Sequence, residues 1–289
     1  MVSKPVNRTR VQRAFSLASA SYDQHAALQR EIGNRLIAHM EFAKIRPRRI
    51  LDIGCGTGFL TRLLRARFRR AEIIALDLSH AMTRTAKQAS ARRLPWQGRT
   101  RFVTADACAL PLGNETCDLV CSNLVMQWVP EPMRMMREMR RVLAPGGLML
   151  FSTFGRRTLS ELRQSLATVA PNHRGVLPFA DIMELGDALA ALPVELPVTD
   201  ADLFTLTYPD TRALLRELKS LGASASAIDK RRGGLYGRRL IRDLEHHYAR
   251  HHSTPDGRVR ATFEALYAQA WYKSDPGFMN DRVIPIRAT

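Results

Sequence analysis

Residues 50–58 read Ile-Leu-Asp-Ile-Gly-Cys-Gly-Thr-Gly, an apolar run that leads into three glycines at alternate positions. A short apolar run of this kind is typical of a buried strand. Gly54, Gly56 and Gly58 allow the backbone to turn tightly and to approach a ligand at the N-terminus of the following helix. The strand, turn and helix together predict an α/β fold that binds a ligand at this turn, as dinucleotide-binding folds do.

The motif departs from the dinucleotide pattern in two respects. The usual dinucleotide spacing is G-x-G-x-x-G, whereas the spacing here is G-x-G-x-G. In addition, Asp52 lies two residues before the first glycine. A carboxylate at that position would repel a pyrophosphate, but it suits the ammonium group of an amino acid. S-adenosylmethionine (SAM) carries such an ammonium group and has no phosphate, so the motif favours SAM.

Two more acidic residues follow predicted strands. Asp77 ends the second strand, 19 residues after Gly58, and a carboxylate there, next to Leu78, can accept hydrogen bonds from both ribose hydroxyls. Asp106 follows the third strand, where it can meet the exocyclic amine of adenine while Ala107 supplies a backbone N–H. Either acid could instead cap the helix or turn after it. Because three carboxylates at the ends of successive strands share one edge of the sheet, we expect a SAM site there.

Apolar runs and helical patterns alternate regularly from residue 49 to residue 154. Parallel strands need crossover helices of this kind, so we expect an α/β, Rossmann-like, doubly wound and mostly parallel sheet of seven strands. Residues 7–43 contain few helix breakers and are expected to be helical. The expected parts are an N-terminal helical lid segment, a SAM-binding core, a substrate-side insertion with a helical lid and the closing strands, and a loose C-terminal tail: residues 1–47, 48–154, 155–273 and 274–289.

The chain contains 44 Lys and Arg against 27 Asp and Glu, a formal net charge of +17. A surface this basic attracts nucleic acid, anionic membranes or an acidic protein, although solvated arginine-rich helix faces explain the charge equally well. Charged residues or proline interrupt every hydrophobic stretch, and no apolar segment follows the basic N-terminus, so neither a membrane span nor a secretory signal is expected. The four cysteines form no CxxC pair, which predicts structural thiols, no metal site and a cytoplasmic location.

The pattern over residues 48–154 resembles the class I SAM-dependent methyltransferases. The N-terminal run RVQRAFSLASASYDQHAALQRE is in addition similar to the first helix of the malonyl-acyl-carrier-protein O-methyltransferases of biotin biosynthesis. Further similar runs are SNLVMQWV, LMLFSTFG followed by TLSELR, LTYPDTRALLRELKSLGA and RATFEALYAQAW. This resemblance spans nearly the whole chain. A family of mitochondrial complex I assembly factors shares the Tyr-Asp of the first helix and is the main competing family.

The resemblance implies transfer of the SAM methyl group to the free carboxylate of a malonyl thioester, an early step of biotin synthesis that leaves S-adenosylhomocysteine. The implied partner is an acidic acyl carrier protein that carries the malonyl group, with malonyl-CoA as the alternative. A carboxylate is already ionised at neutral pH, so no general acid or base is needed. The protein must align the reacting atoms and exclude water, and no catalytic residue is predicted beyond this positioning.

Several other side chains are candidates for the site. The resemblance implies that Tyr22 covers the cofactor, although an aromatic residue on an amphipathic helix is often simple core. Asn123 and Gln127, after the fourth strand, face the usual cofactor and substrate region or else satisfy buried backbone groups. Trp128 is expected in the core. A free carboxylate calls for an arginine, and the sequence does not choose among Arg156, Arg157, Arg174 and Arg212.

Two rival functions remain open on the sequence. The basic charge suggests an RNA methyltransferase, but N-methylating enzymes of that kind often carry an Asn/Asp-Pro-Pro-aromatic motif where this chain reads Ser-Asn-Leu-Val at 122–125, and no RNA-binding module is recognisable. The second rival is an assembly or binding protein that retains SAM as a structural ligand. His247 and His251 are four residues apart on a predicted helix and could bind a metal, although a solvated helix face is the preferred interpretation.

Overall fold

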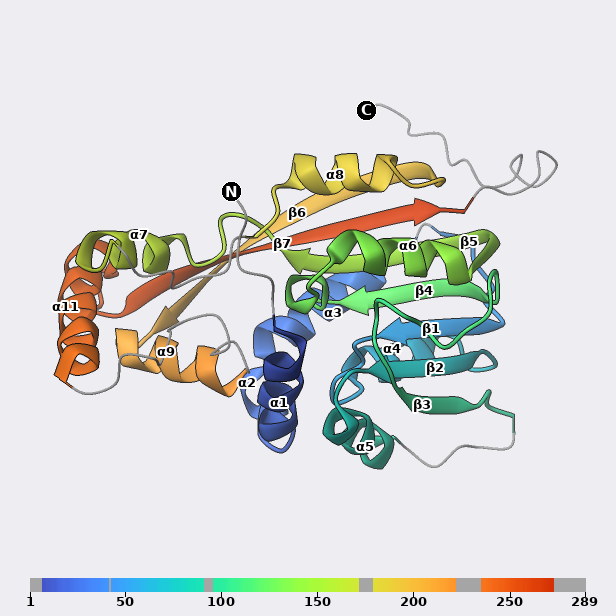
Figure 1. The fold of residues 1–289 in the computed structure, drawn as a ribbon, viewed down its shortest axis with the longest axis horizontal. Coiled ribbons are helices and arrows are strands. Elements are labelled where there is room, and N and C mark those ends of the chain that lie inside the picture. The colour runs from blue at the N-terminus through green and yellow to red at the C-terminus, as the bar shows by residue number, and fades with distance from the viewer. Residues whose placement is uncertain (1–6, 42, 91–95, 172–178, 222–234, 273–289) are drawn as a thin grey trace.

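The structure is a computed structural model that describes residues 7–41, 43–90, 96–171, 179–221 and 235–272. Its centre is one sheet of seven strands in the order β3-β2-β1-β4-β5-β7-β6 (Figure 1). The last strand in the chain runs antiparallel to both of its neighbours, and the other pairs are parallel. The expected Rossmann-like, mostly parallel sheet is therefore confirmed. The strands are β1 (Arg49–Ile53), β2 (Glu72–Asp77), β3 (Thr100–Thr104), β4 (Cys117–Asn123), β5 (Leu143–Phe154), β6 (Glu195–Tyr208) and β7 (Val259–Trp271).

Helices cover both faces of the sheet. They are α3 (Ala27–Ala38), α4 (Phe59–Arg67) and α5 (His80–Ala89) on one face, and α6 (Pro132–Val142) and α8 (Ile182–Ala190) on the other. Successive side chains of a strand point to opposite faces. In β1, Ile50 accordingly packs in the apolar cluster under α3 and α4, whereas Leu51 and Ile53 pack in the cluster under α6 and α8.

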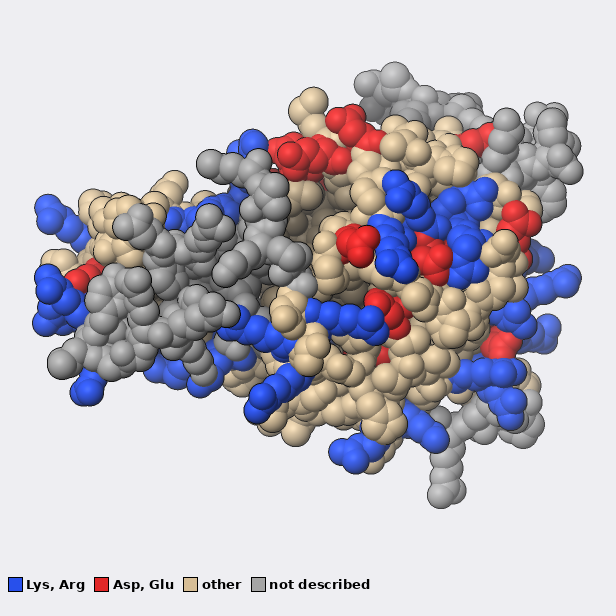
Figure 2. Space-filling view, in the orientation of Figure 1, with Lys and Arg blue, Asp and Glu red and all other residues tan. Residues whose placement is uncertain are grey.

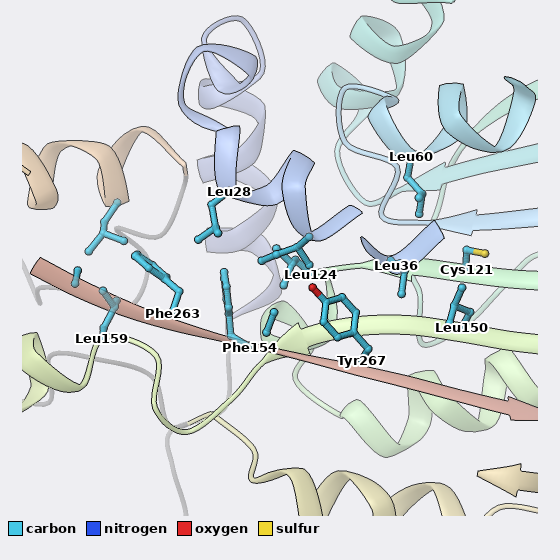
Figure 3. Close-up of a cluster of buried hydrophobic side chains, with 14 of the residues drawn as sticks. Leu28, Leu36, Leu60, Cys121, Leu124, Leu150, Phe154, Leu159, Phe263 and Tyr267 are labelled. Carbon is cyan, nitrogen blue, oxygen red and sulfur yellow. The ribbon is translucent and has the colours of Figure 1, made fainter. Parts of the chain in front are cut away.

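β6 and β7 extend past the end of β5, and three further helices pack around the extension (Figure 1). These helices are α7 (Ser160–Val169), α9 (Thr211–Ser220) and α11 (Leu235–His252). We call these helices, with the ends of β6 and β7 that they cover, the arm. Figure 3 shows Phe154 and Phe263 at the junction, where their ring centroids are 6.0 Å apart, with Leu159 beside them. The apolar core therefore continues from the sheet into the arm.

The N-terminal helical segment differs from the expectation of one helical run over residues 7–43. The structure divides its described part into α1 (Arg8–Ala18), α2 (Tyr22–His25) and α3. At the first break, Ser19 Oγ donates to the carbonyl of Ser16 at 2.9 Å, and side-chain bonds of this kind compete with helix hydrogen bonds. The break turns the chain so that α2 lies over the glycine turn, where Thr57 Oγ1 donates to Asp23 Oδ1 at 2.6 Å.

Residues 144–147 read Ala-Pro-Gly-Gly, a sequence typical of a turn. The structure includes them in β5, with an irregular register against β4 and a positive φ of 72° at Gly146. The predicted loose tail at 274–289 lies outside the described residues. Within the described ranges, no helix combines the length and the apolar character that a membrane span requires.

Candidate active site

The candidate site is a pocket at the C-terminal ends of β1 to β4, the edge at which open α/β sheets bind ligands. It encloses about 770 Å³, part of which is open to solvent. Its walls are the glycine turn, the ends of β2 and β3, the segment that follows β4, and helices α1 and α2. The strand ends thus form one side of the pocket, and the N-terminal helices form another.

The glycine turn forms one wall of the pocket. Gly54 and Gly56 line it with positive φ angles of 69° and 54°. A Cβ atom on Gly54 would lie 2.1 Å from Cγ2 of Val125, so a side chain there is excluded, whereas a Cβ on Gly56 would meet nothing within 4 Å. Gly56 therefore leaves open space for a ligand against the backbone. Gly58 is not among the lining residues, and it starts α4 in close contact with Ala86 of α5.

Asp77 and Leu78 line the pocket at the end of β2. Asp77 Oδ2 accepts a hydrogen bond from the N–H of Gly56 at 2.9 Å, and its Oδ1 accepts one from the N–H of Ser79 at 2.8 Å. Burial raises the pKa of Asp77 although these hydrogen bonds oppose the shift. The two bonds orient the carboxylate at the pocket wall, where it can accept the ribose hydroxyls of a nucleoside.

Asp106 and Ala107 line the pocket beyond the end of β3. Asp106 Oδ1 accepts a hydrogen bond from the N–H of Cys108 at 3.0 Å, and its Oδ2 lies 2.8 Å from Nη1 of Arg8. The pocket thus presents two carboxylates on neighbouring strands together with backbone exposed by Gly56. This set of groups fits the adenosine and amino-acid parts of SAM, and it offers no cluster of donors for a pyrophosphate.

Asp52 is not brought to the pocket wall. It is 1% exposed, and Thr61 Oγ1 donates a hydrogen bond to its Oδ2 at 2.5 Å. Burial raises the pKa of Asp52 to about 7, the negative charge of Asp77 adds to the shift, and the bond from Thr61 opposes it. The neighbouring Ile53 lines the pocket instead. The predicted contact of Asp52 with the ammonium group of SAM stays a prediction.

Aromatic side chains form another wall. Tyr22 lines the pocket, and its ring centroid lies 6.3 Å from that of Phe15, which meets the ring of Trp128 edge-on at 5.3 Å. Burial raises the pKa of Tyr22 far above its ordinary value, with Asp77 and Asp23 adding to the shift. Trp128 was expected in the core, but the 3₁₀ turn η1 (Met126–Trp128) places it at the pocket.

Three residues of α1 that were not predicted from the sequence also line the pocket, namely Arg8, Val11 and Phe15. Their spacing places them along one face of a helix. That spacing was visible in the sequence, but nothing local indicated which element this face would meet.

Asn123 and Gln127 have structural hydrogen bonds. Asn123 lines the pocket, while its Nδ2 donates to the carbonyl of Gln29 at 3.0 Å and its Oδ1 accepts from Ser152 Oγ at 2.7 Å. Gln127 is not among the lining residues, and its Nε2 donates to the carbonyl of Leu124 at 2.9 Å. Asn123 therefore fixes the pocket wall to α3 and β5, and a role for Gln127 in substrate binding stays a prediction.

The structure does not bring the three described candidate arginines to the pocket. Arg156 is 3.2 Å from Asp181 in an exposed ion pair, Arg157 donates its backbone N–H to Glu264, and Arg212 pairs with Glu245 in the arm. These three are absent from the lining residues, because long-range ion pairs and the course of β5 and α9 direct them elsewhere. Arg174 lies outside the described residues.

The remaining candidate chemistry is sparse in the described part of the chain. The rings of His247 and His251 are 4.4 Å apart on α11, but no group of three His, Cys, Asp or Glu side chains there is arranged to hold a metal ion. The four cysteines are buried free thiols. The pocket at the sheet edge is therefore the candidate active site.

Comparison with known proteins identifies the family. Residues 51–151 match the family described as "Methyltransferase domain". The malonyl-[acyl-carrier protein] O-methyltransferase of Halorhodospira halophila is 42% identical over 93% of this chain and 89% of its own length. The chain belongs to this family of SAM-dependent methyltransferases. The enzymes of the same name from Methylovorus sp. and Laribacter hongkongensis are 36% and 38% identical over 98% and 92% of this chain and 95% and 89% of their own lengths.

Solved structures support the fold at lower sequence identity. A putative methyltransferase from Bacillus halodurans has a TM-score of 0.58 at 15% identity, and covers 84% of this chain and all of its own. The YcgJ protein from Bacillus subtilis has the same TM-score at 16% identity, over 84% of this chain and 99% of its own. These similarities show the fold alone.

Proposed function

We propose that this chain methylates the free carboxylate of a malonyl thioester on an acyl carrier protein, as an early step of biotin synthesis. The proposal rests on sequence identity to enzymes of that name. The identity is at least 36% over more than nine-tenths of the chain. It includes the N-terminal helices and the arm as well as the cofactor edge. The products would be the methyl ester and S-adenosylhomocysteine.

The proposed reaction requires the protein to position the reacting groups. When bound, SAM supplies an electrophilic methyl carbon on a sulfonium, and a carboxylate oxygen of the acceptor forms the new bond as the carbon–sulfur bond breaks. The acceptor is ionised at neutral pH, so no proton has to be removed. Asp77 and Asp106 would hold the nucleoside, and the backbone at Gly56 would pass the amino-acid end. Phe15, Tyr22 and Trp128 would exclude water from the acceptor carboxylate and the SAM sulfonium. The attraction between these opposite charges would then be stronger than in water.

We further propose that the carrier is recognised through its acidic surface. Helix α6 contains four arginines and one acid, and it begins two residues after Pro130 of the pocket wall. Figure 2 shows basic side chains gathered over this part of the molecule, with acidic ones among them. Arg141 forms an ion pair with Glu138, whereas Arg137 is exposed. An acidic carrier would be attracted to this face and so toward the pocket.

The direct test is methyl transfer from labelled SAM to malonyl-loaded carrier protein, with acetyl-loaded carrier, succinyl-loaded carrier, malonyl-CoA and RNA as parallel acceptors. Transfer to the malonyl carrier and none to the acetyl carrier would establish methylation of the free carboxylate. Transfer only to RNA, or SAM binding with no transfer to any acceptor, would contradict the proposal and favour the RNA or assembly-factor functions.

The carrier surface is tested by Arg137→Gln, with Arg216→Gln on the exposed face of α9 as the matched control. A single rim charge acts mainly on association, so we expect the KM for malonyl carrier to rise roughly twofold at low salt for Arg137→Gln, with kcat unchanged. The control should behave as the wild type. An equal KM in both variants would place the carrier elsewhere.

A further inference from the structure

Arg8 is a charged residue of the pocket wall that the proposed chemistry leaves without a role. It lies in the first turn of α1, and its Nη1 is 2.8 Å from Oδ2 of Asp106. The Arg8 side chain is 55% exposed and that of Asp106 is 22% exposed. The start of α1 is fixed by Asn7, whose Oδ1 accepts the N–H of Arg10 at 2.9 Å. The helix cap thus sets where Arg8 stands relative to the pocket.

Two more polar contacts continue along the same face of α1. Gln12 Nε2 donates to the carbonyl of Leu78 at 3.0 Å, and the hydroxyls of Ser16 and Ser79 are 2.8 Å apart. Residues 8, 12 and 16 are each four apart, so they lie along one side of the helix. One face of α1 therefore contacts both the loop after Asp77 and the loop that holds Asp106. These are the loops that would bind the ribose and the adenine.

Asp106 has capacity for Arg8 and for an adenine at the same time. An ionised carboxylate accepts about four hydrogen bonds, and the described contacts use one on Oδ1, from the N–H of Cys108, and one on Oδ2, from Arg8. The guanidinium also orients this carboxylate through a charge-assisted hydrogen bond. An adenine amine could therefore bind Asp106 while the contact with Arg8 is kept.

We propose that Arg8 is a positioning residue that latches α1 over the adenosine end of the pocket. The latch retains the cofactor, and S-adenosylhomocysteine leaves when the Arg8–Asp106 pair opens and the N-terminal half of α1 lifts. The inference rests on the use of SAM and is independent of which acyl group accepts the methyl. It assigns to an ion pair the control of product release.

The test is the rate of S-adenosylhomocysteine dissociation from the full chain, measured by stopped-flow displacement with excess SAM analogue and with no acyl acceptor present. We compare Arg8→Gln, Arg8→Lys and Arg13→Gln, the last being exposed on the same helix and outside the pocket wall. For a partly exposed ion pair we expect dissociation roughly three- to fivefold faster in Arg8→Gln. Arg8→Lys should restore most of the wild-type rate, and Arg13→Gln should not change it.

A double-mutant cycle separates the latch from a general effect of charge or folding. In an Asp106→Asn background, where cofactor binding is already weaker, Arg8→Gln should add little further acceleration, because the pair is already broken. An unchanged or slower dissociation in Arg8→Gln would overturn the proposal, and so would full additivity with Asp106→Asn. Thermal unfolding of each variant, followed by circular dichroism, checks that α1 and the sheet remain folded.

Discussion

Two buried carboxylates, one behind the glycine turn and one in the arm, behave in opposite ways. Asp52 is 1% exposed and Glu161 is 6% exposed. The pKa of Asp52 is raised to about 7, whereas the pKa of Glu161 is lowered below its ordinary value. Burial pushes both values upward, so the amount of burial does not explain the difference. The explanation lies in the hydrogen bonds that each carboxylate receives.

Glu161 is saturated with donors from its own and a neighbouring element. Thr262 donates to it twice, from its hydroxyl at 2.5 Å and from its N–H at 3.1 Å, and the hydroxyl of Ser160 adds a third bond at 3.1 Å. Together these outweigh the burial that would raise its pKa. Asp52 has the bond from Thr61, and the charge of Asp77 lies nearby. A buried carboxylate that receives few hydrogen bonds ionises at neutral pH only when a cation lies close to it.

The comparison teaches that the arm and the pocket use buried acids for different purposes. In the arm, Glu161 joins α7 to β7 and its hydrogen bonds are complete without a ligand. Asp52 is buried behind the pocket wall, where the hydrogen bond described for its side chain comes from Thr61, and its contact with an ammonium group is a prediction. Substitutions should therefore separate stability from cofactor affinity between the two regions.

The largest effect is expected for Asp77→Ala. Loss of the ribose acceptor removes charge-assisted hydrogen bonds, so the dissociation constant for SAM should rise roughly a hundredfold. Isothermal titration calorimetry measures this, with Glu217→Gln in the arm as a control that should bind SAM normally. Unchanged SAM affinity in both Asp77→Ala and Asp52→Ala would contradict the placement of the cofactor.

Glu161→Ala should act on stability and spare cofactor binding. It leaves the hydroxyl and N–H of Thr262 without their acceptor, so the free energy of unfolding should fall by about 2–3 kcal/mol. Because the folded-state pKa of Glu161 is lowered, the stabilisation is present above its ordinary pKa and is lost as pH falls through the folded value. Urea unfolding at neutral and acidic pH should show the two proteins converging in acid. A large loss of SAM affinity would erase the distinction between the regions.

Asp52→Asn should act in the opposite sense on pH dependence. The wild-type carboxyl holds a proton up to about pH 7 when folded but loses it near 3.8 when unfolded, so its contribution to stability falls as pH rises through this interval. The variant lacks this fall, so its stability relative to the wild type, measured by urea unfolding, should improve from about pH 4 to about pH 7. Its SAM dissociation constant should rise roughly tenfold, since the ammonium loses a charged partner. A parallel pH dependence in the two proteins would show that Asp52 is ionised throughout.

The smallest effects are expected for a matched pair of variants, Thr61→Val and Thr262→Val. Each removes one hydroxyl that donates a hydrogen bond to a buried carboxylate. Thr262→Val should lower the free energy of unfolding by about 1 kcal/mol with SAM affinity unchanged. Thr61→Val should raise the pKa of Asp52 further and weaken SAM binding roughly two- to threefold near neutral pH. Urea unfolding measures the first effect, and calorimetric titrations of SAM over a pH series measure the second. Equal behaviour of the pair would mean that the two carboxylates do not differ in function.

Features that depend on neighbouring residues were predictable from the sequence. The three glycines after an apolar run predicted the tight turn, and the structure gives each of them a positive φ angle. Asp77 and Asp106 reach one edge because parallel strands end together. The alternation of strand and helix similarly predicted the sheet, and the resemblance predicted the family.

The tertiary structure alone decided which side chains meet across the pocket. Trp128 joins the pocket wall because η1 turns toward α1, and Arg8 meets Asp106 across 98 residues of chain. Arg156 and Arg212 were candidates because a guanidinium binds a carboxylate, but in the structure each forms an ion pair with an acidic side chain of this chain. Sequence spacing sets which residues share a face, but only packing sets what that face touches. For the same reason, the opposite pKa shifts of Asp52 and Glu161 depend on hydrogen-bond donors that the fold brings to one acid and not to the other.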